Sequence, residues 1–193
     1  MRPRGVRAVT ALLVVAAVVA VLAAWAVRAY NRLVRLRNQV ATAWSDIDVQ
    51  LQRRHDLVPQ LVVAVQGYAS HESAVLEAVT ALRARALDLR DPAELGQVEA
   101  ELEQALGRML LLREAYPDLK ASENFMRLQD ELVATEEQLQ YARRFYNGAV
   151  RDLNDGAQRV PDVLVARTFG FGEAAFFQAG ADSRSTPAVD LSR

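Results

Sequence analysis

A histidine beside a carboxylate is the pattern in this chain with the clearest potential for chemistry, because such pairs bind metals or transfer protons. The pattern occurs twice, at His55-Asp56 and His71-Glu72. On one continuous helix the two histidines would lie about 24 Å apart along the axis, too far to share a metal ion. Di-metal helical bundles use Glu-x-x-His, and neither histidine has an acid three residues before it. We therefore expect no metal site and no cofactor.

Other catalytic signatures are missing from the sequence. It contains no cysteine, glycine-rich phosphate loop, nucleophile elbow or His-Glu-x-x-His motif, so we expect no enzyme. One alternative stays open, a metal-binding or enzymatic bundle that uses the polar residues around Arg54, His55 and Pro59.

The net charge of -1 hides an asymmetry along the chain. Residues 1–40 carry seven arginines and no acid, whereas residues 41–193 carry 16 basic and 24 acidic residues. A basic stem thus precedes an acidic domain, which argues against nucleic acid as a partner. With 193 residues, 51% of them hydrophobic, the chain is long enough for one domain of about 150 residues with a core.

Residues 8–27 form an uncharged run that predicts a transmembrane helix. As a helix, these 20 residues would span about 30 Å, the thickness of a bilayer core. At its end, Trp25 and Tyr30 suit a membrane interface, and Arg28 and Arg32 can reach lipid phosphates. We expect a single-pass protein of the cell membrane with the bilayer as one partner. The arginines flanking the run do not decide which side carries the domain.

The competing interpretation of the same run is a cleaved signal peptide, which would release a secreted bundle. Ala24-Trp25-Ala26 satisfies an A-x-A cleavage site behind a basic flank. The run is longer than the usual hydrophobic region of about 7–15 residues, and the helical pattern continues past the site, so we prefer the membrane span.

Beyond the span, apolar residues recur every three or four positions, which predicts an all-α, up-down-up-down antiparallel four-helix bundle. The expected helices are 28–67, 71–90, 92–116 and 122–158. Gly67 and Ser70 supply a stop and an N-cap between the first two, and Asp91-Pro92 starts the third. An alternative fuses the first two helices into one kinked helix, which gives a three-helix domain. The predicted divisions are a basic flank (1–7), the span (8–27), the bundle domain (28–178) and a disordered polar tail (179–193).

Two charged residues interrupt the apolar stripes of the first and fourth helices, Arg54 and Glu136. They lie at similar heights, about 39 and 36 Å from the membrane ends of their helices, so we predict that they pair. The alternative is that both side chains extend into water, and the neighbouring pairs Glu136-Glu137 and Arg143-Arg144 are typical of a solvated face. Pro59 lacks an N–H and frees the carbonyl of His55, which predicts a kink.

A set of short motifs between residues 28 and 178 resembles the LemA family. The matching motifs are Tyr30-Asn31, Trp44-Ser45-Asp46-Ile47-Asp48-Val49-Gln50-Leu51, Arg53-Arg54, Asp56-Leu57-Val58-Pro59, Gly67-Tyr68-Ala69, His71-Glu72, Tyr116-Pro117-Asp118-Leu119-Lys120-Ala121, Phe125, Thr135-Glu136, Ala142-Arg143-Arg144 and Tyr146-Asn147. The sequence departs from the family at Leu153-Asn154, where a second Tyr-Asn is typical, and at Arg159-Val160-Pro161, where an aromatic residue usually precedes the proline. The resemblance implies a single-pass bacterial membrane protein with a helical bundle and no established enzymatic activity.

A phenylalanine cluster closes the chain before the tail, at Phe169, Phe171, Phe176 and Phe177. It can cap the end of the bundle or contact lipid. Because a fourth helix as long as the first returns the chain to the level of Arg28, we predict that Phe176 and Phe177 lie at the membrane interface.

The sequence thus predicts a membrane-tethered helical bundle that acts as a non-enzymatic interaction or scaffolding module. Its expected partners are the bilayer and another membrane or envelope protein. The residues expected to carry structural or interaction roles are Arg54, Glu136, Pro59 and Asn147.

Overall fold

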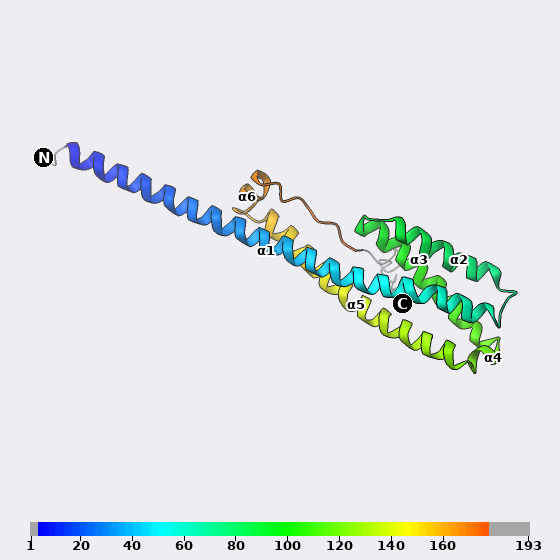
Figure 1. The fold of residues 1–193 in the computed structure, drawn as a ribbon. Helices are drawn as coiled ribbons and strands as arrows, with labels where there is room; N and C mark the ends of the chain where they lie inside the picture. The colour runs from blue at the N-terminus through cyan, green and yellow to red at the C-terminus, as the bar shows by residue number, and fades with distance from the viewer. Residues whose placement is uncertain (1–3, 178–193) are drawn as a thin grey trace, which may run out of the picture. The chain divides into compact units, whose positions relative to one another are not determined.

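The described part of the chain, residues 4–177, is all α-helical with no strand in the computed structural model (Figure 1). This confirms the predicted fold class. The helical elements are α1 (Arg4–Gln66), α2 (Ser73–Asp88), α3 (Pro92–Leu111), the 3-10 turn η1 (Leu112–Glu114), α4 (Pro117–Lys120), α5 (Glu123–Gln158) and α6 (Val163–Thr168). The predicted polar tail, 179–193, lies outside the described residues, as do the first three residues of the basic flank.

The residues group into two compact units. One, which we term the stem unit, comprises Met1–Thr42 and Gly148–Ala174. The other, the bundle unit, comprises Ala43–Asn147 and Ala175–Arg193. Both α1 and α5 contribute residues to each unit.

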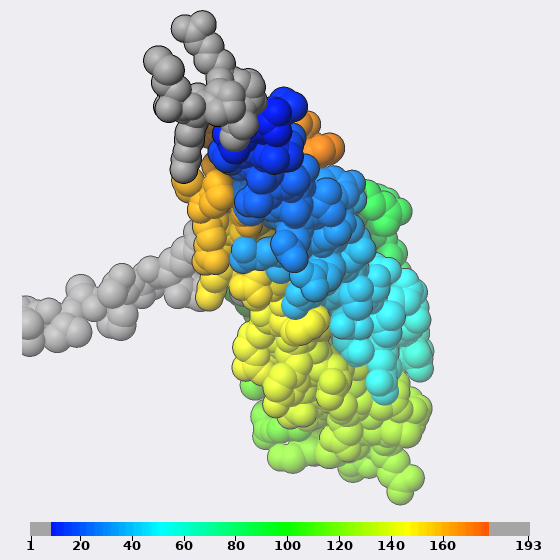
Figure 2. All heavy atoms as spheres, turned by 90° about the vertical axis from the view of Figure 1, so that its left-hand side faces the viewer, coloured from blue at the N-terminus to red at the C-terminus, as the bar shows by residue number. Residues whose placement is uncertain are grey.

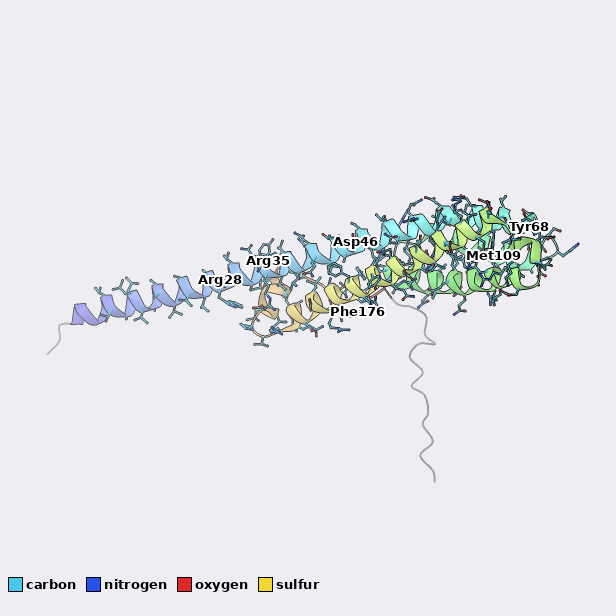
Figure 3. All side chains as sticks on the ribbon, turned by 90° about the horizontal axis from the view of Figure 1, so that it is seen from below. Arg28, Arg35, Asp46, Tyr68, Met109 and Phe176 are labelled. Carbon is cyan, nitrogen blue, oxygen red and sulfur yellow. The ribbon has the colours of Figure 1, made fainter. Side chains whose placement is uncertain are left out.

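The bundle unit contains the four predicted helices, as residues 43–66 of α1, α2, α3 and residues 123–147 of α5. Figure 1 shows α2 and α3 side by side, and Figure 2 shows yellow-green spheres of α5 against cyan spheres of α1. Met109, labelled in Figure 3, is fully buried in the core that these helices share. The other buried core residues are Leu57, Val58, Leu61, Val65, Ala69, Leu76, Val79, Leu102, Ala105, Leu106, Leu119, Phe125, Leu128 and Leu132.

Helix α1 ends at Gln66, which confirms the predicted break at Gly67 and shows that the alternative of a fused first helix is wrong. The turn that follows, marked by Tyr68 in Figure 3, closes with Ala69 N–H donating to the Val65 carbonyl at 2.8 Å. The prediction of Ser70 as the next N-cap is wrong. The cap residue is Glu72, which makes no side-chain cap bond; its carboxylate accepts instead from the Tyr116 hydroxyl at 3.2 Å.

The start of α3 follows the prediction, because Asp91 Oδ1 accepts from the N–H groups of Ala93 and Glu94 at 2.9 and 3.0 Å, with Pro92 in the first turn. Its end does not. Helix α3 stops at Leu111, five residues before the predicted end, and η1 and α4 follow. Proline at 117 disfavours a helical conformation for the residue before it, so the chain must turn before a new helix begins.

Helix α5 keeps the most regular repeat predicted from the sequence. Its start is capped by Ser122 Oγ, which accepts from the Phe125 N–H at 3.4 Å. Every apolar residue predicted on its stripe is buried, namely Phe125, Leu128, Leu132, Leu139, Ala142, Tyr146, Val150, Leu153 and Ala157.

The stem unit joins residues up to 42 of α1 with the end of α5 and with α6, a helix that the periodicity did not predict. Ala29, Leu33, Ala157, Val165 and Ala166 form its core, against which Trp25, Ala26 and Phe171 pack. Small residues let the helices approach closely, and a Cβ added at Gly156 would lie 2.9 Å from Leu36 Cδ1. In Figure 3, the N-terminal turns of α1, well before Arg28, have no other described element beside them.

Candidate functional site

A buried cluster of charged side chains lies inside the bundle unit, and we refer to Arg54, His55, Glu99 and Glu136 as the charge cluster. Arg54 and Glu99 are fully buried. Arg54 Nη1 donates to Glu99 Oε2 at 2.8 Å and to the Glu99 carbonyl at 3.3 Å. His55 Nε2 donates to the other carboxylate oxygen, Oε1, at 2.7 Å. Both oxygens of Glu99 are therefore held from the same turn of α1.

Glu136 on α5 completes the cluster, since its Oε2 accepts a hydrogen bond from Arg54 Nη2. The contact predicted between Arg54 and Glu136 is thus present, and the alternative that both side chains extend into water is wrong. Arg54 joins three helices, α1, α3 and α5, through one guanidinium. Such buried pairs fix the register of a bundle more than they add stability, because desolvation offsets much of the attraction.

Pro59, one helical turn after the cluster, changes the hydrogen bonding of the His55 carbonyl. It leaves the His55 carbonyl without its helical donor, and Arg83 Nε of α2 donates to that carbonyl at 2.7 Å. Helix α1 continues through Pro59 to Gln66. The proline therefore links α1 to α2 through the carbonyl that it frees.

Burial and pairing act in opposite directions on these groups. Burial would lower the pKa of Arg54, but attraction to Glu136 and Glu99 leaves it above its usual value. Burial would raise the pKa of Glu99, but the His55 hydrogen bond and the charge on Arg54 leave it below the usual value. For Glu136, burial outweighs attraction to Arg54, so its pKa is raised. The Arg54 guanidinium thus bonds two carboxylates, but only Glu99 has a lowered pKa.

Arg143 extends the polar interior, contrary to the solvated face predicted for it. It is buried, its Nη1 donates to Glu103 at 3.3 Å, and its guanidinium lies 5.2 Å from the centre of the Phe177 ring. Burial, followed by repulsion from Arg54, lowers its pKa. Arg144, in contrast, is exposed and lies over Tyr141.

Asn147 holds the segment that follows α6. Its side-chain amide donates to the Phe177 carbonyl and accepts from the Phe177 N–H, both at 3.0 Å. Phe177 is 1% exposed and its ring packs on Trp44 and Arg143, so the predicted membrane-interface position is wrong for this residue. Phe176 is half-buried, and its interface position stays a prediction.

In the stem unit, Asn154 makes the same two-bond pairing with Ala174, at 3.0 and 2.9 Å. Asn154 follows Leu153, where the LemA pattern has a tyrosine, and the asparagine side chain bonds the backbone of Ala174. The structure therefore assigns equivalent tasks to Asn147 and Asn154, one in each unit.

Four of the six residues predicted at the membrane interface belong to the stem unit, namely Trp25, Arg28, Tyr30 and Arg32. Tyr30 makes edge contacts with the rings of Phe169 and Phe171, at centroid distances of 4.9 and 5.7 Å. Arg32 pairs with Asp162 at 3.2 Å. Trp25 packs on the stem core and Arg28 is exposed. Their contact with lipid stays a prediction.

A groove opens beside the charge cluster, between α3 and α5, with a volume of about 330 Å³. We term it the α3–α5 groove. Its lining residues are Glu103, Leu106, Gly107, Leu110, Leu132, Val133, Glu136, Glu137 and Gln140. Glu103 and Gln140 also line a neighbouring pocket of about 350 Å³ with Arg143, Arg144, Asn147 and Phe177. An apolar groove thus adjoins a basic and polar pocket.

Most coordinating atoms of the cluster already bond each other, although Arg54 Nε and Glu136 Oε1 are buried without a hydrogen-bond partner among the described residues. Within residues 4–177, no three His, Cys, Asp or Glu side chains are grouped so that they could hold a metal ion.

Sequence reasoning missed Glu99 as the central acid of the cluster. Its position in the sequence could have revealed it, since Glu99 falls between Leu95 and Leu102 on the buried face of α3.

The fold defines a membrane-associated helical protein, since α1 is the one helix of the described residues long and apolar enough to cross a membrane. The sequence model of the LemA family matches residues 43–191, and the chain belongs to the LemA family.

Two kinds of relatives resemble the chain. The protein LemA of Metamycoplasma hominis is 26% identical over 153 residues, which cover 77% of this chain and 68% of that protein. The magnetosome proteins MamQ 1 and MamQ 2 of Paramagnetospirillum magneticum are 24% identical over 175 residues, which cover 77% of this chain and 64% of theirs. The chain thus spans roughly two thirds of these relatives' lengths.

Proposed function

We propose that this protein is a single-pass, membrane-tethered interaction module without catalytic activity, and that its bundle unit binds a helix of another membrane or envelope protein. The observation that carries the proposal is the closed charge cluster beside an open groove. Arg54, Glu99 and Glu136, whose pKa values are shifted, are largely buried and bonded to one another, which suits a structural role. The groove beside them is the accessible feature.

The walls of the α3–α5 groove have the features of a helix-docking surface. Leu106, Leu110 and Leu132 give it an apolar floor, and Val133 on α5 is 47% exposed at its side. Leu111, one residue beyond the groove on α3, is 67% exposed. Gly107 is exposed, and a Cβ added there would meet nothing within 4 Å. An amphipathic helix binds such a surface through residues spaced at i, i+3, i+4 and i+7.

Site-specific photocrosslinking in native membranes tests the proposal. A photoreactive phenylalanine analogue is placed at Val133 or at Leu111, and at Leu87 of α2 as a matched exposed control. We expect the same cross-linked protein from both groove positions and none from Leu87.

A blocking variant makes the test specific. Gly107→Trp fills the groove from an exposed position, whereas Glu101→Trp adds the same side chain to an exposed position of α3 outside the groove. Gly107→Trp should abolish the cross-link and Glu101→Trp should leave it unchanged. Equal cross-linking from all positions, or a cross-link that survives Gly107→Trp, would contradict groove binding.

A further inference from the structure

Helix α6 of the stem unit has one face with protein neighbours and one without. Val165 and Ala166 are buried in the stem core. Leu164, directly before Val165 in the same helix, is 63% exposed, and Val160 and Phe169 on either side of α6 are 80% and 58% exposed. We refer to Val160, Leu164 and Phe169 as the α6 patch. Large apolar side chains this exposed and this close in sequence mark a surface with a partner.

The level of α6 along α1 indicates what that partner is. Trp25 and Ala26 pack against the core that holds Val165 and Ala166, and they lie two residues and one residue before Val27, the end of the uncharged run 8–27. An element packed on these residues lies where the apolar run ends. Asp162, immediately before α6, pairs with Arg32 at 3.2 Å, which places the start of α6 beside the first basic residues after the run.

The composition around the patch matches a lipid interface better than a protein surface. Exposed arginines lie on both contributing elements, Arg28 and Arg35 on α1 and Arg159 and Arg167 beside the patch. Tyr30 packs edge-on against the Phe169 ring. Apolar and aromatic side chains next to arginines are typical of segments that lie in the headgroup region.

We propose that α6, with Val160 and Phe169, is a second membrane contact that inserts the α6 patch into the lipid interface beside the end of the α1 span. A lone transmembrane helix turns freely about its own axis. A side element that enters the interface on one face of α1 fixes that rotation. This inference rests on the proposed span, and its test distinguishes the two.

The experiment uses the full chain in phosphatidylcholine vesicles that contain phosphatidylglycerol. The sequence has no cysteine, so a single introduced cysteine carries an environment-sensitive fluorophore at one defined place. The probe position is Leu164→Cys. Val18→Cys, in the middle of the uncharged run, reports the span, and Leu111→Cys is an exposed leucine of the bundle unit. Quenching is measured with lipids that carry a nitroxide at the headgroup or on the acyl chain.

We expect the Leu164→Cys label to emit at shorter wavelength than the Leu111→Cys label and to lose intensity with the headgroup nitroxide. Quenching at Leu164 no greater than at Leu111, while Val18 is quenched, would overturn the α6 contact and leave the span. Absence of quenching at Val18 would overturn the span instead, and the inference with it.

A charge in the patch provides a second test. With the label at Val160→Cys, Leu164→Asp should reduce quenching by headgroup nitroxides, because a carboxylate resists entry into the interface. Leu111→Asp serves as the control and should leave it unchanged. Circular dichroism confirms that both variants remain helical. Unchanged quenching with Leu164→Asp would show that the patch does not insert.

Discussion

The same two helices, α1 and α5, are joined in two different ways in the bundle unit and the stem unit. In the bundle unit, Arg54 of α1 bonds Glu136 of α5, and Trp44 packs on Tyr146 at a centroid distance of 5.3 Å. In the stem unit, Leu36 meets Gly156, and Ala29 and Leu33 pack with Ala157. In the bundle unit both helices contribute large or charged side chains, whereas in the stem unit leucines of α1 meet small residues of α5.

This difference separates two sources of order. Apolar contacts between leucines and small residues allow close packing but specify position less strongly than paired charges, because hydrophobic contacts are non-directional. A buried arginine with two carboxylates tolerates only the register in which every charge is paired. The charge cluster therefore fixes how the helices of the bundle unit align.

The largest expected effect is the loss of Arg54. Arg54→Ala leaves Glu99 and Glu136 without their guanidinium and should lower the free energy of unfolding by about 3–5 kcal/mol. Arg85→Ala removes the exposed pair with Glu101 and should cost about 1 kcal/mol or less. Thermal melting of the full chain in detergent compares the two. Equal losses would mean that the cluster is no more important than a surface pair.

Coupling within the cluster is measured by a double-mutant cycle of Arg54→Ala and Glu136→Ala. Because the two side chains share a hydrogen bond, their effects on the free energy of unfolding should differ from additivity by about 0.5–3 kcal/mol. Strict additivity would mean that they do not meet in solution.

The contributions of the two acids of the cluster to stability should depend on pH in opposite directions. The pKa of Glu99 is lowered in the folded protein, so its ionised form stabilises above its usual pKa of 4.5, and this stability is lost as pH falls through the lower folded value. The pKa of Glu136 is raised in the folded protein, so its protonated form stabilises the fold below pH 4.5. This stability is lost as pH rises through the higher folded value.

Glu99→Gln should therefore cost roughly 1–3 kcal/mol at pH 7 and flatten the loss of stability in acid. Glu136→Gln should cost less at pH 7, since it removes the carboxylate whose ionisation opposes folding. Stability measured by denaturant at pH 7 and in acid checks both signs. A larger cost for Glu136→Gln at pH 7 would reverse the assignment.

A smaller effect is expected at Asn147, whose amide makes two hydrogen bonds with Phe177. Asn147→Leu removes both and should cost about 1–2 kcal/mol, with faster chymotrypsin cleavage beside Phe177. Asn124 is an exposed asparagine of the same helix, and Asn124→Leu should leave that cleavage unchanged. Unaltered cleavage in Asn147→Leu would mean that the ring contacts alone hold the segment.

The smallest effects concern two glycines of α5 in the stem unit. Gly148→Ala places its methyl group in open space and should stabilise by about 0.5–1 kcal/mol through helix propensity. Gly156→Ala gains the same propensity but meets Leu36 Cδ1 at 2.9 Å, so its net gain should be smaller or negative. Comparing the melting temperatures of the two variants measures the tightness of the stem contact. Equal gains would indicate slack packing there.

Much of the fold was predictable because it depends on local chemistry. The break at Gly67, the cap at Asp91 and the buried repeat of α5 follow from residues within a few positions of one another. Arg54 and Glu136 were found for a related reason, since a charge on an apolar stripe must find a partner. The six-residue α6 was missed because a helix this short, directly behind Pro161, has no period to detect.

The sequence by itself determined the helical period, the uncharged run and the positions where charge enters an apolar face. Tertiary structure alone decided which charges share a partner: Glu99 stands between Arg54 and His55, and Arg143 turns inward beneath Phe177. It also separated the phenylalanines, with Phe171 against Tyr30 and Phe177 against Trp44. The physical reason is that a stripe specifies which face of a helix is buried. The neighbour that it meets there depends on residues distant in sequence, through packing and desolvation that no local pattern encodes.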